Sequence, residues 1–305
     1  MSAVGIIFSN IHNETIDELT RKRTSASIPF GGRYRLIDFA LSNFVNANIT
    51  SVGVLTQKNY QSLMDHLGSG KDWDLSRKNG GLIIFPPFSS HRSDFLYENR
   101  FEALMSVNGY ISKRHEDYVV LTDCDNVNVI DYQKVLEQHE KSDADITIVY
   151  RNQVVTEDLV DHMTIEVNED GRVNKATLRA KVGEEASVAV NVWVINRRLL
   201  EGLLVDAASR REHITKTIIP ALEAGKIILC DRFLDSSLAY QGFARELGVE
   251  NVLNMNQFAT EGLYPDLTIL VCTHPEIGMT RIKKDERDMD RLEHEKMPFH
   301  LKVYE

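Results

Sequence analysis

Residues 28–43 read IPFGGRYRLIDFALSN, and this stretch decides the fold of the N-terminal part of the chain. From Tyr34 to Asn46, apolar residues recur with the spacing i, i+3, i+4, i+7 and i+8, which predicts a helix with one buried stripe. The stripe consists of Ile37, Ala40, Leu41, Phe44 and Val45. A helix of this kind needs a sheet or a second helix to cover its apolar side.

Short β-branched runs alternate with such amphipathic stretches and are predicted to be strands. They are Val4–Phe8, Ser51–Thr56, Leu82–Phe85, Tyr118–Leu121, Ile146–Tyr150 and Val188–Ile195. Strands and helices in alternation predict a parallel sheet covered by helices. Residues 160–177 break this pattern, because two alternating runs flank the turn-like Asn168-Glu169-Asp170-Gly171. An antiparallel hairpin is expected there.

After Arg198 the pattern predicts one long helix, Leu199–Leu222, which ends at Gly225. Two further strands are expected at Lys226–Cys230, as a buried strand, and at Asp266–Val271. The last residues, 275–305, are helical in pattern and heavily charged.

Composition limits the possible classes of protein. A chain of 305 residues, 43% of them hydrophobic, is long enough for two ordinary domains. The net charge of −10 argues against nucleic acid as a partner, because binding a phosphate backbone needs a cationic face. Cys124, Cys230 and Cys272 lie far apart in or beside apolar runs, so they are expected to be small buried side chains. Without a membrane span or a signal-peptide pattern, a cytoplasmic location is expected.

The opening stretch, followed by Val52-Gly53-Val54-Leu55-Thr56-Gln57, resembles the nucleotidyltransferase domain of glucose-1-phosphate adenylyltransferase (ADP-glucose pyrophosphorylase). The resemblance covers residues 1–200 and implies an α/β, Rossmann-like (GT-A-like) sheet. It also implies a glycine-rich loop, G-G-x-G-T-R-L, that holds the nucleotide triphosphate through backbone amides and an arginine.

The residues that such a domain uses for catalysis are largely replaced in this chain. Residues Ser9–Thr15, where the loop is expected, contain no glycine and no arginine. The family's R-A-K-P is replaced by Arg23-Thr24-Ser25-Ala26-Ser27, and its G-T-A-D-A by Asn99-Arg100-Phe101-Glu102-Ala103. The pattern resembles the non-catalytic, regulatory-type subunit of the family. That resemblance implies a role in glycogen biosynthesis and a catalytic adenylyltransferase subunit as partner.

One acidic position of the family is kept. Asp125 matches the aspartate that binds Mg²⁺ in the motif G-D-H…D-Y, and carboxylate oxygens suit this ion. An aspartate after a buried strand is also a common turn or helix-cap residue, and Asp123 is a second candidate for the same role. Both interpretations of Asp125 stay open.

Residues 230–242 read CDRFLDSSLAYQG and resemble a different family, the bacterial thymidylate kinases. The resemblance covers residues 201–305 and implies that Asp231 and Arg232 form the family's D-R-[YFH] signature at the reaction centre. It further implies that Arg210 and Arg232 hold the phosphate of dTMP, as guanidinium groups do. Tyr240 and Gln241 would line the nucleoside pocket.

Residues 287–293 resemble the basic lid of these kinases, with Arg287 and Arg291 as lid arginines. The other interpretation is a solvated helix face with i, i+4 charge pairs. The loop G-x-x-x-x-G-K-[ST], which binds ATP phosphates, is absent from the sequence. The second part is therefore expected to be a partial P-loop-kinase-type α/β segment without its P-loop.

Three functions remain possible for a chimera of this kind. The chain is a regulatory, adenylyltransferase-like protein with a segment that binds dTMP, or a dTMP kinase whose ATP site a partner supplies. Alternatively it is an inactive fusion product, for which unpaired sheet edges predict poor solubility.

Overall fold

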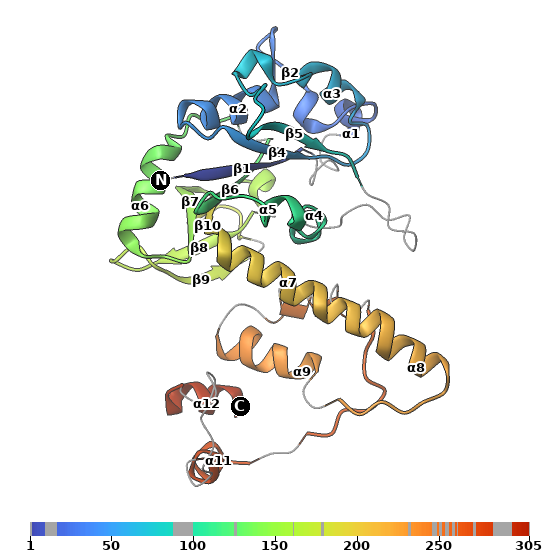
Figure 1. Ribbon diagram of the computed structural model, residues 1–305. Coiled ribbons are helices and arrows are strands. Elements are labelled where there is room, and N and C mark those ends of the chain that lie inside the picture. Colours follow the sequence, from blue (N-terminus) through green and yellow to red (C-terminus); the bar gives the residue numbers. More distant parts are fainter. Residues whose placement is uncertain are drawn as a thin grey trace. The chain divides into compact units, whose positions relative to one another are not determined.

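The computed structural model describes most of the chain. The described residues are 2–9, 17–87, 100–124, 127–160, 162–177, 180–230, 233–245, 249, 252–253, 256–257, 260, 262–270, 273–282 and 295–304. Two compact units make up the chain: residues 1–151 with 189–206, and residues 152–188 with 207–305. Figure 1 shows the elements of both.

The main sheet has the strand order β5-β4-β1-β6-β10-β8-β9, and β7 also pairs with β10. Its strands are β1 (Ala3–Phe8), β4 (Ser51–Leu55), β5 (Gly81–Phe85), β6 (Tyr118–Asp123), β7 (Ile146–Val154), β8 (Thr164–Val167), β9 (Val173–Thr177) and β10 (Glu185–Asn196). Strands β5, β4, β1 and β6 are parallel, and β10 is antiparallel to β6. The sheet is thus α/β and mainly parallel on one side, as the sequence predicts.

Helices cover both faces of the parallel strands. They include α2 (Leu36–Asn46), α3 (Gln61–Leu67), α4 (Arg100–Ser106), α5 (Asn108–Ile111) and α6 (Tyr132–Ser142), and the short helix α1 (Asp17–Thr20) precedes them in the chain. Ile7 of β1 packs in one core cluster with residues of α2 and α6, whereas its neighbours Ile6 and Phe8 pack with α4 and α5. This alternation is the period of two that a strand imposes.

Helix α2 confirms the apolar stripe found in the sequence, but it begins two residues later than the pattern predicts. Tyr34–Arg35 form the short strand β3, which pairs with β2 (Pro29–Phe30). The backbone N–H of Arg35 then donates to the Asp38 carboxylate over 3.0 Å and satisfies one amide at the start of the helix.

The hairpin expected at residues 160–177 is present as β8 and β9, which pair antiparallel. Within the second unit, β8 also pairs with β10 through Ser187 and Val188. In the first unit, residues 192–196 of β10 pair with β6. Strand β10 therefore contributes pairing to both units.

The long C-terminal helix is confirmed, although part of it is wound more loosely. It consists of α7 (Arg197–His213), a π-helical turn (Ile214–Ile218) and α8 (Ile219–Glu223), and Gly225 follows with φ of 74°. Further helices in the described part of the chain after α8 include α9 (Leu234–Ser237), a π-helix (Leu238–Ala244), α11 (Pro275–Ile282) and α12 (Met297–Tyr304).

The prediction of two strands after α8 is wrong for the residues that the structure describes. Residues 226–230 and 266–270 form no strand, and most of their large apolar side chains are exposed. An apolar strand buried on both faces needs paired neighbours and covering helices. Among the described residues after Asn196, the structure contains no strand that could pair with them.

The cysteine prediction is correct for one residue and wrong for another. Cys124 is buried, as expected, whereas Cys230 is exposed because its segment is not a buried strand. Cys272 lies outside the described residues. No helix in the described part of the chain is both long and apolar enough to cross a bilayer.

Candidate functional site

The carboxyl end of β1, where the sequence leads us to expect a phosphate-binding loop, is hydrogen-bonded to the chain's own residues. The Ser9 carbonyl accepts the Ser25 hydroxyl at 2.8 Å, the Cys124 thiol at 3.3 Å and the Ala26 N–H at 3.2 Å. Ser25 and Ala26 belong to a buried 3-10 turn. The segment that replaces R-A-K-P therefore packs directly against the end of this strand.

The carboxyl end of β6 lies next to β1 in the parallel sheet and carries a buried acid. Asp123 is 4% exposed, and the Arg100 guanidinium of α4 donates to both of its carboxylate oxygens. The Nε–Oδ1 distance is 2.9 Å. Two parallel bonds between a guanidinium and a carboxylate hold both groups in one plane.

This ion pair occupies the side of the sheet at which open α/β sheets bind their ligands, outside the carboxyl ends of parallel strands. By the resemblance to glucose-1-phosphate adenylyltransferases, Arg100 would stand within the residues that replace the nucleotide loop G-T-A-D-A. The Asp123 carboxylate does not fit a Mg²⁺ site, because an arginine already neutralises it. Among the described residues there is no cluster of three or more potential metal ligands.

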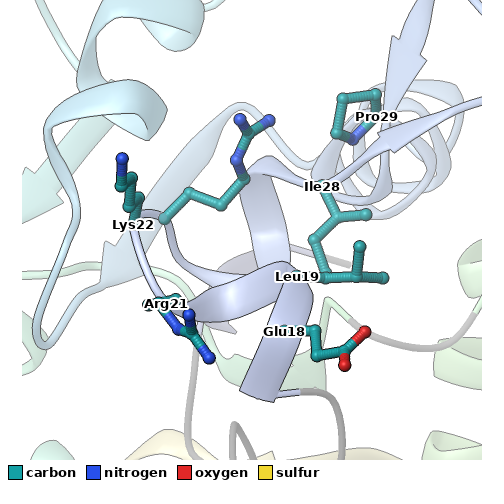
Figure 2. A pocket seen from close by; sticks show the side chains of 7 residues that line it. Glu18, Leu19, Arg21, Lys22, Ile28 and Pro29 are labelled. Atoms are coloured by element: carbon teal, nitrogen blue, oxygen red, sulfur yellow. The ribbon is translucent and has the colours of Figure 1, made fainter.

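A shallow hollow of about 330 Å³ lies beside the buried turn, between α1 and β2. Its walls include the apolar Leu19 and Ile28 and the basic Arg21 and Lys22. Figure 2 shows that the Arg21 and Lys22 side chains extend in different directions. Arg23 and the acidic Glu18 also line the hollow, so its walls carry charges of both signs.

In the second unit, two of the predicted dTMP-binding residues are neighbours on the π-helix 238–244. The Tyr240 ring lies 6.2 Å from the Phe299 ring of α12, and the Arg245 guanidinium lies over the same ring at 5.4 Å. Arg245 also pairs with Glu295 at 2.6 Å. These contacts join the π-helix to α12.

The amide oxygen of Gln241 is buried and has no hydrogen-bond partner among the described residues. A buried carbonyl without a partner costs about 1–3 kcal/mol, so native proteins rarely retain one without a reason. Gly242 follows, and a side chain there would meet the Val249 backbone at 3.0 Å. In the sequence Tyr240-Gln241-Gly242, the amide oxygen without a partner therefore lies next to a glycine that packs closely against the backbone.

The structure does not describe the side chains of the other predicted site residues. Asp125, Asp231, Arg232, Arg287 and Arg291 lie outside the described residues. Arg210 lies on α7, but its side chain is not described. These positions stay predictions.

Sequence reasoning missed two features of the site. It did not pair Arg100 with Asp123, although an arginine within a replaced nucleotide loop and an acid at a strand end were both visible in the sequence. It also missed Phe299, whose contact with Tyr240 spans 59 positions of the chain and leaves no local pattern.

The fold has a counterpart among solved structures. A crystal structure from Bacillus anthracis, assigned as a glucose-1-phosphate thymidylyltransferase and determined with sucrose, matches with a TM-score of 0.51 at 13% identity. The match covers 71% of this chain and 76% of that one. At this identity the likeness concerns the fold, which is that of a nucleotidyltransferase.

The family follows from the sequence match. The family model "Nucleotidyl transferase" matches residues 14–231, which is more than half of the chain. The protein belongs to the nucleotidyl transferase family. A second model, "Thymidylate kinase", matches residues 194–305, so the two matches overlap around α7. The predicted boundary between residues 200 and 201 falls in this overlap and stays a prediction.

Curated relatives resemble the second part of the chain. The thymidylate kinase of Halalkalibacterium halodurans is 53% identical over 103 residues, 33% of this chain and 49% of the relative. The thymidylate kinase of Staphylococcus epidermidis is 52% identical over 119 residues, 36% of this chain and 59% of the relative. The chain therefore spans between about half and three fifths of the length of these relatives.

Proposed function

We propose that the first unit is a non-catalytic, regulatory-type domain related to glucose-1-phosphate adenylyltransferase, acting in glycogen biosynthesis beside a catalytic subunit. The Arg100–Asp123 ion pair carries this proposal. Arg100, whose side chain is 30% exposed, neutralises the buried acid at the end of β6, on the side of the sheet where open α/β sheets bind their ligands. The hydrogen bonds to the Ser9 carbonyl support the same conclusion.

The test compares catalysis with association. The purified chain, mixed with ATP, glucose 1-phosphate and Mg²⁺, should release no pyrophosphate above background. Mixed with a bacterial catalytic adenylyltransferase subunit, it should co-elute in size-exclusion chromatography and change that subunit's kinetics. Pyrophosphate release by the chain alone, lost in Asp125→Asn, would contradict the proposal and support a working Mg²⁺ site.

For the kinase-like unit we propose that it binds dTMP, with Gln241 pairing with the base edge and Arg210 and Arg232 holding the phosphate. The buried amide oxygen of Gln241 favours this reading, because a ligand donor such as a base N–H would satisfy it. Mg²⁺ would enter only with ATP, whose site this chain lacks. A complete dTMP kinase reaction would therefore need a partner that supplies the P-loop.

Calorimetric titration with dTMP tests this part. We expect saturable binding that Gln241→Leu weakens by about 5-fold or more, since a buried hydrogen bond to a ligand is worth at least about 1 kcal/mol. The matched control is Gln133→Leu, because Gln133 is an exposed glutamine on α6. Equal affinities for all three proteins would remove Gln241 from the site, and no heat with dTMP would favour the inactive fusion.

A further inference from the structure

Tyr240 and Gln241, the two residues assigned above to the nucleoside, lie on the π-helix Leu238–Ala244. Helices of this type, with hydrogen bonds from i to i+5, are rare and occur frequently at functional sites. The buried amide oxygen of Gln241 has no hydrogen-bond partner among the described residues to fix its direction. The direction of this amide therefore depends on the contacts that hold the π-helix in place.

Arg245 closes the π-helix at its C-terminal end and connects it to the last helix of the chain. Its backbone N–H donates to the Tyr240 carbonyl over 3.2 Å, which is an i+5 hydrogen bond. Its guanidinium pairs with Glu295 at 2.6 Å and lies 5.4 Å from the centre of the Phe299 ring of α12. One residue thus holds the backbone of Tyr240 through its main chain and α12 through its side chain.

The helix α12 also contacts Tyr240 directly. The centres of the Phe299 and Tyr240 rings are 6.2 Å apart and the rings are tilted by 50°, within the range of about 4.5–7 Å in which aromatic pairs attract each other. Glu295 is tied to α12 as well, because the Nε2 atom of His300 lies 3.2 Å from its carbonyl oxygen. Both groups that hold the Arg245 guanidinium are therefore fixed to one helix.

The exposure of the Arg245–Glu295 pair indicates which property of the protein the pair affects. The two side chains are 36% and 35% exposed, and an ion pair with such exposure contributes little to stability. A hydrogen bond, in contrast, weakens steeply when its donor and acceptor move out of line. Loss of the pair should therefore disturb the direction of the Gln241 amide far more than the stability of the unit.

We propose that Arg245 is a positioning residue for dTMP. Held by Glu295 and Phe299, it fixes the C-terminal end of the π-helix and so directs the Gln241 amide toward the base edge. Arg245 itself makes no contact with the nucleotide. The inference rests on the proposed binding of dTMP by this unit, and it makes α12 an element on which that binding depends.

Calorimetric titration of the full chain with dTMP tests this role. We expect Arg245→Ala to weaken binding by about 5-fold, the loss that removal of the Gln241 hydrogen bond would cause. Phe299→Leu should weaken binding too, because leucine has no aromatic face for the guanidinium. Arg245→Lys should restore part of the loss, since its ammonium group can still pair with Glu295.

The matched control breaks another exposed ion pair of the same unit. Lys175 of β9 lies 3.5 Å from the Glu166 carboxylate of β8, and both side chains are largely exposed. Lys175→Ala should bind dTMP with the affinity of the unchanged chain.

A double-mutant cycle separates positioning from a general structural role. In the Gln241→Leu background, Arg245→Ala should change the affinity by less than about 2-fold, because the group that Arg245 directs is then absent. Without dTMP, Arg245→Ala should lower the unfolding temperature by no more than about 4 °C. A merely structural role would weaken dTMP binding equally in both backgrounds.

The outcomes for Arg245 and for the proposed function can be told apart. If Arg245→Ala binds dTMP as the unchanged chain does, or loses the same affinity in both backgrounds, Arg245 does not position Gln241. The dTMP site then still stands if Gln241→Leu weakens binding. An unchanged chain that does not bind dTMP overturns both. If Arg245→Ala does not fold, the same cycle with Phe299→Leu decides.

Discussion

The ion pair between Arg100 and Asp123 lies at the carboxyl end of β6, and its contribution to the stability of the domain can be measured. Asp123 is 4% exposed, so removal of Arg100 leaves a buried carboxylate without its cation. Breaking one partner of a buried pair costs about 3–5 kcal/mol. We therefore expect Arg100→Ala to lower the free energy of unfolding by about 3 kcal/mol in urea titrations.

The exposed pair between Arg77 and Asp74 provides the comparison, because both side chains lie in solvent. Surface pairs contribute about 0–1 kcal/mol. If Arg77→Ala and Arg100→Ala cost the same, the buried pair is not a structural feature of the domain, and the site beside β6 is open to a ligand.

A second residue-scale prediction concerns pH and His139 of α6. Burial lowers the pKa of the His139 imidazole below its ordinary value, while the Asp145 carboxylate opposes part of this shift. The unfolded chain, with a pKa near 6.5, then binds more protons than the folded chain between the two pKa values. Stability is full above about pH 6.5 and falls as the pH decreases through that window.

Urea unfolding between pH 5 and pH 8 measures this dependence. We expect His139→Gln to flatten the curve below pH 6.5, because glutamine does not titrate and can still pair with Thr147, which lies 2.7 Å from the His139 ring. His115→Gln is the control, since His115 is exposed. An unchanged acid slope in His139→Gln would show that other groups set the pH dependence.

At the scale of elements, the packing of β1 against α2 depends on the absence of a side chain at Gly5. A Cβ atom at this position would lie 2.6 Å from the ring of Phe44, which is fully buried. Overpacking of a core costs about 1–3 kcal/mol. Gly5→Ala should destabilise the protein by that amount, and Phe44→Leu should recover part of the loss in the double variant.

Thermal unfolding of the four proteins of this cycle gives the coupling between the two positions. Gly202→Ala serves as control, because Gly202 lies within α7 with open space around it, and alanine favours a helix by about 1 kcal/mol. Additive effects of Gly5→Ala and Phe44→Leu would contradict the close approach of β1 and α2.

The elements also show how far the sequence predicts this fold. The stripe from Ile37 to Val45 and the β-branched runs give the strands and α2, because their periods report burial directly. Residues 226–230 have the same composition as a buried strand, yet they stay exposed. Burial of such a run depends on neighbours elsewhere in the chain, and local pattern carries no information about whether they are present.

The same limit of local sequence pattern applies to the predicted site residues. Tyr240 and Gln241 could be placed on one helix from a motif of a few residues. Phe299 and the Arg100–Asp123 pair could not, because they depend on contacts between distant elements. Acidic and basic residues near strand ends indicate where a site lies. Whether these residues pair with one another decides whether the site stays open to a ligand.

At the scale of the whole molecule, the two compact units predict two separate responses to ligand, because most of the residues that match thymidylate kinase lie in the second unit. The two tryptophans, Trp73 and Trp193, both lie in the first unit, so their fluorescence follows the unfolding of that unit. Calorimetry follows the unfolding of both units. Heating the chain should therefore give one transition seen by both methods and one seen by calorimetry alone.

We expect dTMP to raise only the transition that tryptophan fluorescence does not report, because Gln241 belongs to the second unit. At 100 times its dissociation constant, a ligand adds about 2.7 kcal/mol to the stability of the state it binds. For a unit of this size the shift is roughly 5–10 °C, and Gln241→Leu should reduce it at the same dTMP concentration. If dTMP instead moves the tryptophan transition, the nucleotide binds the nucleotidyltransferase-like unit, and the dTMP pocket assigned to the kinase-like unit is wrong.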